Sequence, residues 1–245
     1  MVDIHKSFGG VKALKGVDFT VGRGEVVGLI GDNGAGKSTL IKILVGVYQP
    51  DEGDIYFDGV KVRWSSPLSA RKSGIETVHQ NLGLVNLMSV SRNFFLGKEP
   101  STHRIFLDKR KADKESMEAI QHFGIKLRNP NETVQNLSGG ERQSIMIAKA
   151  VYFGAKLLVL DEPTIALSVA ETRKVIDTVG RVKEEGTSVI FISHNIRHVC
   201  DIADRFTILI NGEKIGDIES KDATTDIIED AIVTGRLPNR EPSRA

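Results

Sequence analysis

Two glycine-containing segments of the sequence carry residues that could bind phosphate. The first, GDNGAGKST at residues 31–39, closes on Lys37 and Ser38. Glycines permit a tight turn, and backbone N–H groups at the start of a following helix attract anions. Lys37 would reach the β- and γ-phosphates, and the Ser38 hydroxyl would bind magnesium. The segment therefore predicts a loop for a nucleoside triphosphate, made of Gly31, Asp32, Asn33, Gly34, Ala35, Gly36, Lys37, Ser38 and Thr39.

The second segment, QNLSGGERQS at residues 135–144, again leads from a serine through glycines into a helical pattern. Ser138 is of the type that caps a helix, here one beginning around Glu141. Gly139 and Gly140 leave the amide end of that helix bare, which makes a second anion site. A helix cap with a flexible entry explains the same residues. One nucleotide does not need two such anion sites from one chain, so the ligand of this second turn has to be explained separately.

Carboxylates follow an apolar run in AKLLVLDEP, residues 155–163. Neighbouring side chains on a strand point to opposite sides, so Asp161 and Glu162 are expected to serve different purposes. Asp161 is suited to holding magnesium, and Glu162 to accepting a proton from an attacking water or orienting it. The alternative is a pair of capping carboxylates before Pro163. His194 ends a further strand and is either a catalytic group or a structural histidine.

The elements that must position these groups alternate between apolar strands and amphipathic helices. Strands are predicted at 24–31, 155–163 and 187–194, and helices at 38–48 and about 170–185. The second of these strands is apolar on both faces, as in a parallel sheet covered on both sides. Parallel strands bring their carboxyl ends to one edge of a sheet, where such folds bind ligands. The glycine loop, the two carboxylates and the histidine are therefore expected to converge.

Two regions depart from this alternation. Residues 11–23 and 54–64 alternate apolar and polar positions, with a turn at Asp58-Gly59, which predicts a small antiparallel β lobe. Residues from about 80 to 135 are helical in pattern and carry one apolar stripe that is typical of a core, formed by Met117, Ile120 and Phe123. The fold class is therefore α/β, a parallel-sheet core with a small antiparallel β lobe and an inserted helical lobe.

Composition and segment character limit the organisation and the class of function. We expect one domain over 1–235, with the helical lobe at about 80–153, and a loose polar tail over 236–245. The 33 basic and 32 acidic residues show no long run of one sign, so nothing marks a nucleic-acid footprint. Cys200 is the only cysteine, which excludes an internal disulfide and suits a buried thiol in a reducing compartment.

The termini and the apolar stretches predict a chain that is soluble when alone. No stretch approaches the roughly 18 apolar residues of a membrane span, and the N-terminus lacks the apolar core of a signal peptide. The first residues resemble a strand that is already under way. This pattern leaves room for a few residues upstream of Met1.

Five motifs together resemble the nucleotide-binding domain of an ABC transporter. In order along nearly the whole chain they are GDNGAGKST, HQN with Gln80, LSGGE, LLVLDEPT and ISH. The resemblance implies a P-loop NTPase core of the RecA-like kind that binds ATP and Mg²⁺. It also implies that two such domains pack head to tail, so that LSGGE closes on the γ-phosphate held by the partner's phosphate loop. Ser138, Gly139 and Gly140 would then serve the site of the other subunit.

The resemblance assigns further roles by position. Phe8 would stack on adenine, although stacking alone does not separate adenine from guanine. Gln80 would sense the γ-phosphate and the metal, and His194 would contact the γ-phosphate. The implied catalytic residues are thus Glu162, His194 and Gln80, and the implied metal ligands are Ser38, Gln80 and Asp161. The sequence departs from the family at Ser168, where an aspartate usually closes the loop that crosses the dimer, so communication between subunits could differ.

Within the family, three segments are most similar to bacterial importers of monosaccharides of the ribose, xylose and fructose kind: GVKAL, GIETVHQNLGLVNLMSVSRNFFLGKEP and ISHNIRHVCDIADR. The similarity implies an ATPase at the cytoplasmic face of the cell membrane. It would work as a homodimer bound to membrane-spanning permease subunits and, through them, to a sugar-binding protein. The stretch NLGLVNLMSV lies where the family docks its permease, although burial in the helical lobe explains it almost as well. The sugar is not touched by this subunit, so these residues do not identify it.

Two other classes of function compete with this interpretation. A soluble ABC-type ATPase acting on nucleic acid or ribosomes would resemble tandem domains or a domain split by long coiled coils, and neither pattern occurs in this sequence. A nucleotide-binding regulator without turnover would not need its catalytic groups, yet all are intact: Lys37, Asp161, Glu162 and His194. The sequence therefore favours a transport ATPase that has no nucleic-acid partner.

Overall fold

The computed structural model describes residues 1–78, 83–102 and 106–237. Its largest sheet has six strands in the order β12-β11-β3-β10-β9-β6. The pairings from β11 through β3, β10 and β9 to β6 are parallel, and β12 lies antiparallel at one edge. The strand bounds are β3 Val26–Ile30, β6 Ile75–Val78, β9 Leu157–Asp161, β10 Ser188–Ile192, β11 Arg205–Ile210 and β12 Glu213–Glu219.

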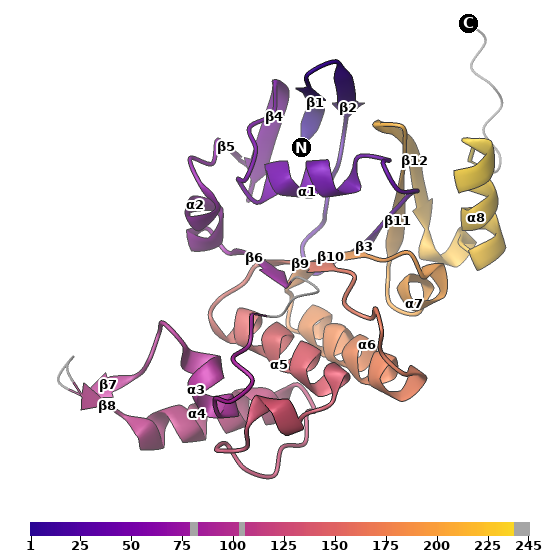
Figure 1. Ribbon diagram of the computed structural model, residues 1–245. Helices are drawn as coiled ribbons and strands as arrows, with labels where there is room; N and C mark the ends of the chain where they lie inside the picture. The colour runs from indigo at the N-terminus through magenta and orange to yellow at the C-terminus, as the bar shows by residue number, and fades with distance from the viewer. Residues whose placement is uncertain (79–82, 103–105, 238–245) are drawn as a thin grey trace, which may run out of the picture.

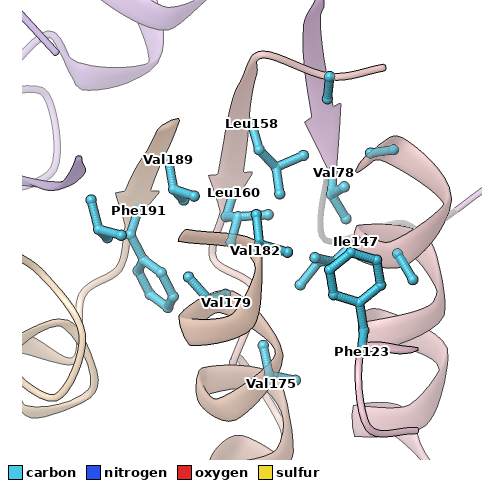
Figure 2. Packing of buried hydrophobic residues seen from close by; sticks show 14 of the residues in the cluster. Val78, Phe123, Ile147, Leu158, Leu160, Val175, Val179, Val182, Val189 and Phe191 are labelled. Atoms are coloured by element: carbon cyan, nitrogen blue, oxygen red, sulfur yellow. The ribbon is translucent and has the colours of Figure 1, made fainter. Parts of the chain in front are cut away.

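Helices cover both faces of this sheet, which explains why its central strands are apolar throughout. Every residue of β3 and β10 is buried. In Figure 1, α1 (Lys37–Leu44) lies on one side of the sheet, and α5 (Gly139–Tyr152) and α6 (Val169–Glu184) lie on the other. Figure 2 shows Val175, Val179 and Val182 on the side of α6 that faces the strands. Each fully buried valine of this kind stabilises the fold by roughly 1.5–3 kcal/mol.

A second, four-stranded sheet has the order β2-β1-β4-β5 and is antiparallel. Its strands are β1 Val2–Phe8, β2 Val11–Val17, β4 Glu52–Phe57 and β5 Val60–Val62. Asp58 and Gly59 both have positive φ, 50° and 79°, as expected of a tight hairpin turn between β4 and β5. The predicted alternation over 11–23 was too long, because the chain leaves the sheet after Val17 and turns where the Glu25 amide donates to the Gly22 carbonyl.

Between β6 and β9 the chain forms mainly helices. These are α3 (Val90–Phe95), α4 (Lys109–His122) and α5, with a two-stranded hairpin of β7 (Ser101–Thr102) and β8 (Phe106–Leu107). The predicted stripe is confirmed at Ile120 of α4 and at Phe123 just after that helix, which are buried, while Met117 is only partly buried. Figure 1 shows these helices below the large sheet, on the side opposite the four-stranded sheet.

The remaining elements are short. They are α2 (Pro67–Lys72), α7 (Ile196–Cys200), α8 (Thr225–Thr234) and two 3₁₀ turns, η1 (Val134–Asn136) and η2 (Ser220–Asp222). Cys200 is partly buried, and burial raises the pKa of its thiol, which agrees with a packing residue. Within the described residues, no helix is both long enough and apolar enough to cross a membrane.

Candidate nucleotide site

The phosphate loop lies between the end of β3 and the start of α1, as the sequence predicted. Gly36 is the N-cap of α1 and has a φ of 101°, in the left-handed region that favours glycine. A Cβ at Gly36 would also lie 2.8 Å from the Ala13 carbonyl oxygen. The loop therefore needs glycine at this position for both its backbone angle and its fit against the neighbouring strand.

Lys37 is enclosed by the loop that it follows. The residue is 7% exposed, and its ammonium donates to the backbone carbonyls of Gly31 and Asp32, the latter at 3.0 Å. Burial lowers the pKa of Lys37, while nearby carboxylates oppose that effect, Glu162 most strongly. The ammonium is thus held at the centre of the loop, close to the carboxylates that end β9.

Asp161 is the last residue of β9, and Glu162 follows it with a positive φ, so the predicted strand alternation does not extend to Glu162. Asp161 lines a cavity of about 430 Å³ together with Ser38. Glu162 instead lines a different cavity of about 480 Å³ together with Gly139 and Arg142. Ser38 and Asp161 thus border the same space, and hydroxyl and carboxylate oxygens are ligand types that suit Mg²⁺. Gln80, the third predicted ligand, follows β6 but lies outside the described residues.

Glu162 is held in place by the segment that follows β10. Its carboxylate accepts hydrogen bonds from the His194 backbone amide at 2.9 Å and from the Ser193 hydroxyl at 3.3 Å. The His194 imidazole Nε2 lies 3.5 Å from the same carboxylate. Glu162 also has a φ of 52°, a conformation that a non-glycine residue adopts at a cost of about 1–3 kcal/mol. The two predicted catalytic side chains are therefore neighbours, and Glu162 is fixed at a strained position.

The second glycine segment forms a well-ordered helix start. The Ser138 hydroxyl accepts from the Glu141 amide at 3.3 Å, and the Glu141 carboxylate accepts from the Ser138 amide at 3.0 Å. This reciprocal pair is a capping box. A Cβ at Gly140 would lie 2.8 Å from the Glu171 carbonyl oxygen of α6. The predicted cap is confirmed, but the entry is packed rather than flexible.

Phe8 and Ser168, which lie outside these two loops, also make specific contacts. Phe8 ends β1 with 42% of its surface exposed and lies edge-on to Tyr48 at a centroid distance of 5.2 Å. Ser168 caps α6, where its hydroxyl accepts from the Glu171 amide and its own amide donates to the Glu171 carboxylate at 2.9 Å. A serine in place of the usual aspartate thus keeps the cap.

The structure brings most of the predicted residues to one edge of the large sheet. β10 lies between β3 and β9, so the phosphate loop, the β9 carboxylates and His194 follow three neighbouring strands. The Ser138–Gly140 turn reaches the Glu162 cavity through Gly139. Sequence reasoning missed Ser193, for which no local pattern exists. It also missed Glu171, although the spacing of Ser168 and Glu171 matches a capping box.

A comparison with protein families decides the identity of the fold. The ABC transporter family matches residues 14–165. The chain belongs to that family. It is 49% identical to a xylose/arabinose import ATP-binding protein of Sulfolobus acidocaldarius, over 87% of this chain and 84% of that protein. It is 40% identical to a fructose import ATP-binding protein of Rhizobium meliloti, over 98% of this chain and 93% of that protein.

Solved structures of ABC cassettes share the same architecture. The chain superposes on the ADP conformation of an ATP-binding cassette with a TM-score of 0.81, at 25% identity over 95% of this chain and 93% of that one. A dimeric bacterial cassette matches with a TM-score of 0.73, at 25% identity over 89% and 97% of the two chains. As a family member, the chain is an ATPase whose hydrolysis is coupled to transport. The chain spans about half the length of several ribose-import relatives that it matches.

Proposed function

We propose that this chain is the ATP-hydrolysing subunit that powers import of a monosaccharide across the cytoplasmic membrane. The observation that carries the proposal is the convergence of Lys37, the β9 carboxylates and His194 at one sheet edge. Relatives with this family's fold are named as import ATP-binding proteins for xylose/arabinose, ribose and fructose. The competing assignment, an ATPase that acts on nucleic acid or ribosomes, gains no support from these relatives.

The residues divide the work on ATP between them. Lys37 and the loop amides would bind the phosphates, and Phe8 would stack on the adenine. Ser38, Asp161 and Gln80 would hold Mg²⁺, which supplies positive charge to the phosphates when bound. Glu162 would orient the attacking water and take its proton, and its hydrogen bonds to Ser193 and the His194 amide fix it for that task. His194 and Gln80 would contact the γ-phosphate.

Two copies of the chain would complete the sites between them. Solved relatives include dimeric cassettes, one of them bound to ADP and phosphate after hydrolysis. We place the partner's γ-phosphate against Ser138, Gly139 and Gly140, which have no role in the chain's own phosphate loop. Glu162 and Gly139 line one cavity, so the hydrolytic carboxylate of one site lies beside the phosphate-binding turn of the other.

The permease would dock on the NLGLVNLMSV stretch, residues 81–90, of which the structure describes residues 83–90. Asn93 holds this segment by bonds to the Val85 amide at 2.8 Å and the Val85 carbonyl at 3.0 Å. The side chains of Val85 and Leu87 are nevertheless 43% and 78% exposed. An ordered backbone with exposed apolar side chains suits a protein interface. The chain would thereby sit at the cytoplasmic face of the membrane. It would form one domain over 1–235, with the helical lobe at about 80–153. A sugar-binding protein would contact only the permease.

Glu162→Gln tests the hydrolytic assignment. The amide keeps the shape of the carboxylate but does not take a proton, so we expect ATP binding to persist and turnover to fall about 100-fold or more. Steady-state ATPase and nucleotide-binding assays measure the two effects. Glu118→Gln, at an exposed position of α4, is the matched control and should hydrolyse ATP normally. Wild-type turnover in Glu162→Gln would remove Glu162 from the mechanism.

Val85→Asp tests the docking surface. A charge at this exposed valine should reduce recovery of the permease complex and transport several-fold, because burying an unpaired carboxylate is costly. Basal ATPase of the isolated chain and its melting temperature should change little. Val233→Asp is the control, since Val233 is 84% exposed on α8. If Val85→Asp unfolds the chain, or the complex forms normally, the docking surface is wrongly placed.

A further inference from the structure

Helices α5 and α6 begin with the same arrangement and lie side by side (Figure 1). Each is preceded by a serine, Ser138 or Ser168, whose hydroxyl accepts a hydrogen bond from the backbone amide of the glutamate three residues later. The carboxylate of that glutamate accepts a hydrogen bond from the serine amide in turn. Lys174 of α6 connects the pair by an ion pair with Glu141 of α5 at 3.4 Å. The start of α5 is therefore next to the carboxylate that caps α6.

That carboxylate, Glu171, is shared between the two helix starts. Its Oε2 accepts from the Ser168 amide at 2.9 Å and from the Ser168 hydroxyl at 2.8 Å. Its Oε1 faces α5, since a Cβ at Gly139 would lie 3.5 Å from it. Bonds from the Ser168 amide and hydroxyl hold the pKa of Glu171 below its usual value, and the amides of Gly140 and Gly139 add to this effect. Negative charge is thus already present where α5 presents its first amides.

We propose that Glu171 is a positioning residue that competes with the partner's γ-phosphate for the start of α5. This inference rests on the proposed sharing of ATP sites between two chains. The first amides of a helix have no partner within the helix, and they attract one anion readily but not two anions together. When two chains close on ATP, the Glu171 carboxylate has to move away from Gly139 and Gly140. Glu171 therefore raises the ATP concentration needed for closure.

Ser168 makes this competition possible. Its hydroxyl donates to the Glu171 carboxylate, which holds that carboxylate between the two helix starts. An aspartate at position 168 would cap α6 as well, but its charge would repel Glu171 from the same place. The serine that departs from the family pattern and the glutamate three residues later therefore act as one unit.

The test compares ATP-dependent dimer formation in full-length chains that carry Glu162→Gln to slow hydrolysis. Adding Glu171→Gln removes the charge but keeps an oxygen that accepts the Ser168 bonds. We expect the ATP concentration for half-maximal dimer, measured by light scattering, to fall by about two- to fivefold per site, the usual effect of a charge at a helix N-terminus. Glu184→Gln makes the same charge change at the far end of α6, about 20 Å away, and should leave it unchanged.

The possible results distinguish a failure of the proposed Glu171 role from a failure of the shared ATP site. A loss of capping alone would lower the melting temperature and raise the ATP requirement, the opposite sign. Glu171→Ala removes the charge and the side-chain half of the capping box while the Ser168 cap remains, so it should lower the melting temperature yet still lower the ATP requirement. If the Glu162→Gln parent dimerises normally with ATP and both Glu171 variants need the same or a higher ATP concentration, only the role of Glu171 is overturned. No ATP-dependent dimer in the parent overturns the shared site as well.

Discussion

The two glycine-containing loops both start helices, but they use their glycines for different reasons. In the phosphate loop, Gly34 and Gly36 have φ values of 84° and 101°, so the backbone path itself requires glycine. Gly139 and Gly140 have no positive φ, and Gly140 is needed because α6 lies against it. The first loop is shaped to wrap a ligand, whereas the second is shaped to let two helices approach.

The charged groups next to the two loops also differ. The first loop encloses an ammonium, that of Lys37. The second is flanked by two carboxylates of its own chain, Glu141, which pairs with Lys174, and Glu171. An anion would therefore bind readily at the first loop in an isolated chain, and at the second only if a partner delivers it. Variants that disturb one loop at a time can break or sharpen this comparison.

Gly36→Ala should have the larger effect. The added Cβ would meet the Ala13 carbonyl oxygen at 2.8 Å, and alanine is strained at a φ of 101°. We expect a loss of about 2–4 kcal/mol in the free energy of unfolding and loss of ATP binding by the single chain. Thermal unfolding and nucleotide titration measure both. Gly59→Ala is the control for positive φ alone, since no atom lies within 4 Å of its Cβ position, and it should bind ATP normally. Retained binding in Gly36→Ala would contradict a loop that depends on this backbone.

Gly140→Ala should have the smaller effect on the single chain. Its Cβ would meet the Glu171 carbonyl oxygen at the same 2.8 Å, but the backbone angle suits alanine. We expect a loss of about 1–2 kcal/mol, normal ATP binding by each chain and weakened ATP-dependent dimer formation. Equilibrium unfolding, nucleotide titration and light scattering separate these effects. If Gly140→Ala loses single-chain binding as Gly36→Ala does, the two loops do not differ in the way described.

Much of the core was predictable because strands and helices here follow simple periodicity. The strand expected at 24–31 forms over Val26–Ile30, and the helix expected at about 170–185 forms over Val169–Glu184. The helix expected at 38–48 was too long, since α1 ends at Leu44. There the chain turns back, with Gly46 at a φ of 78° and the Val47 amide bonded to the Lys42 carbonyl. The glycine was the available signal for that end.

The site was predictable where one segment carries it and not where two helices share it. The sequence predicted that Asp161 and Glu162 diverge, and the two do line different cavities, although Glu162 lies just past the end of β9. The approach of Glu171 to Gly139 depends on how α5 packs against α6, which no local spacing encodes. The bond from Ser193 to Glu162 depends in the same way on the pairing of β10 with β9. Such contacts between elements are where the structure adds to the sequence.

The measurement that tests the central claim most directly mixes two damaged chains. Lys37→Ala damages the phosphate loop, and Ser138→Arg damages the second turn, so every site in either homodimer contains one damaged half. A mixed dimer contains one intact site and one site damaged twice. Nucleotide trapping and ATPase rate are measured across mixing ratios, with subunit exchange verified by different tags. The account predicts trapping well above the sum of the two separate proteins, and trapping that stays at that sum despite exchange would show that the second turn serves only its own chain.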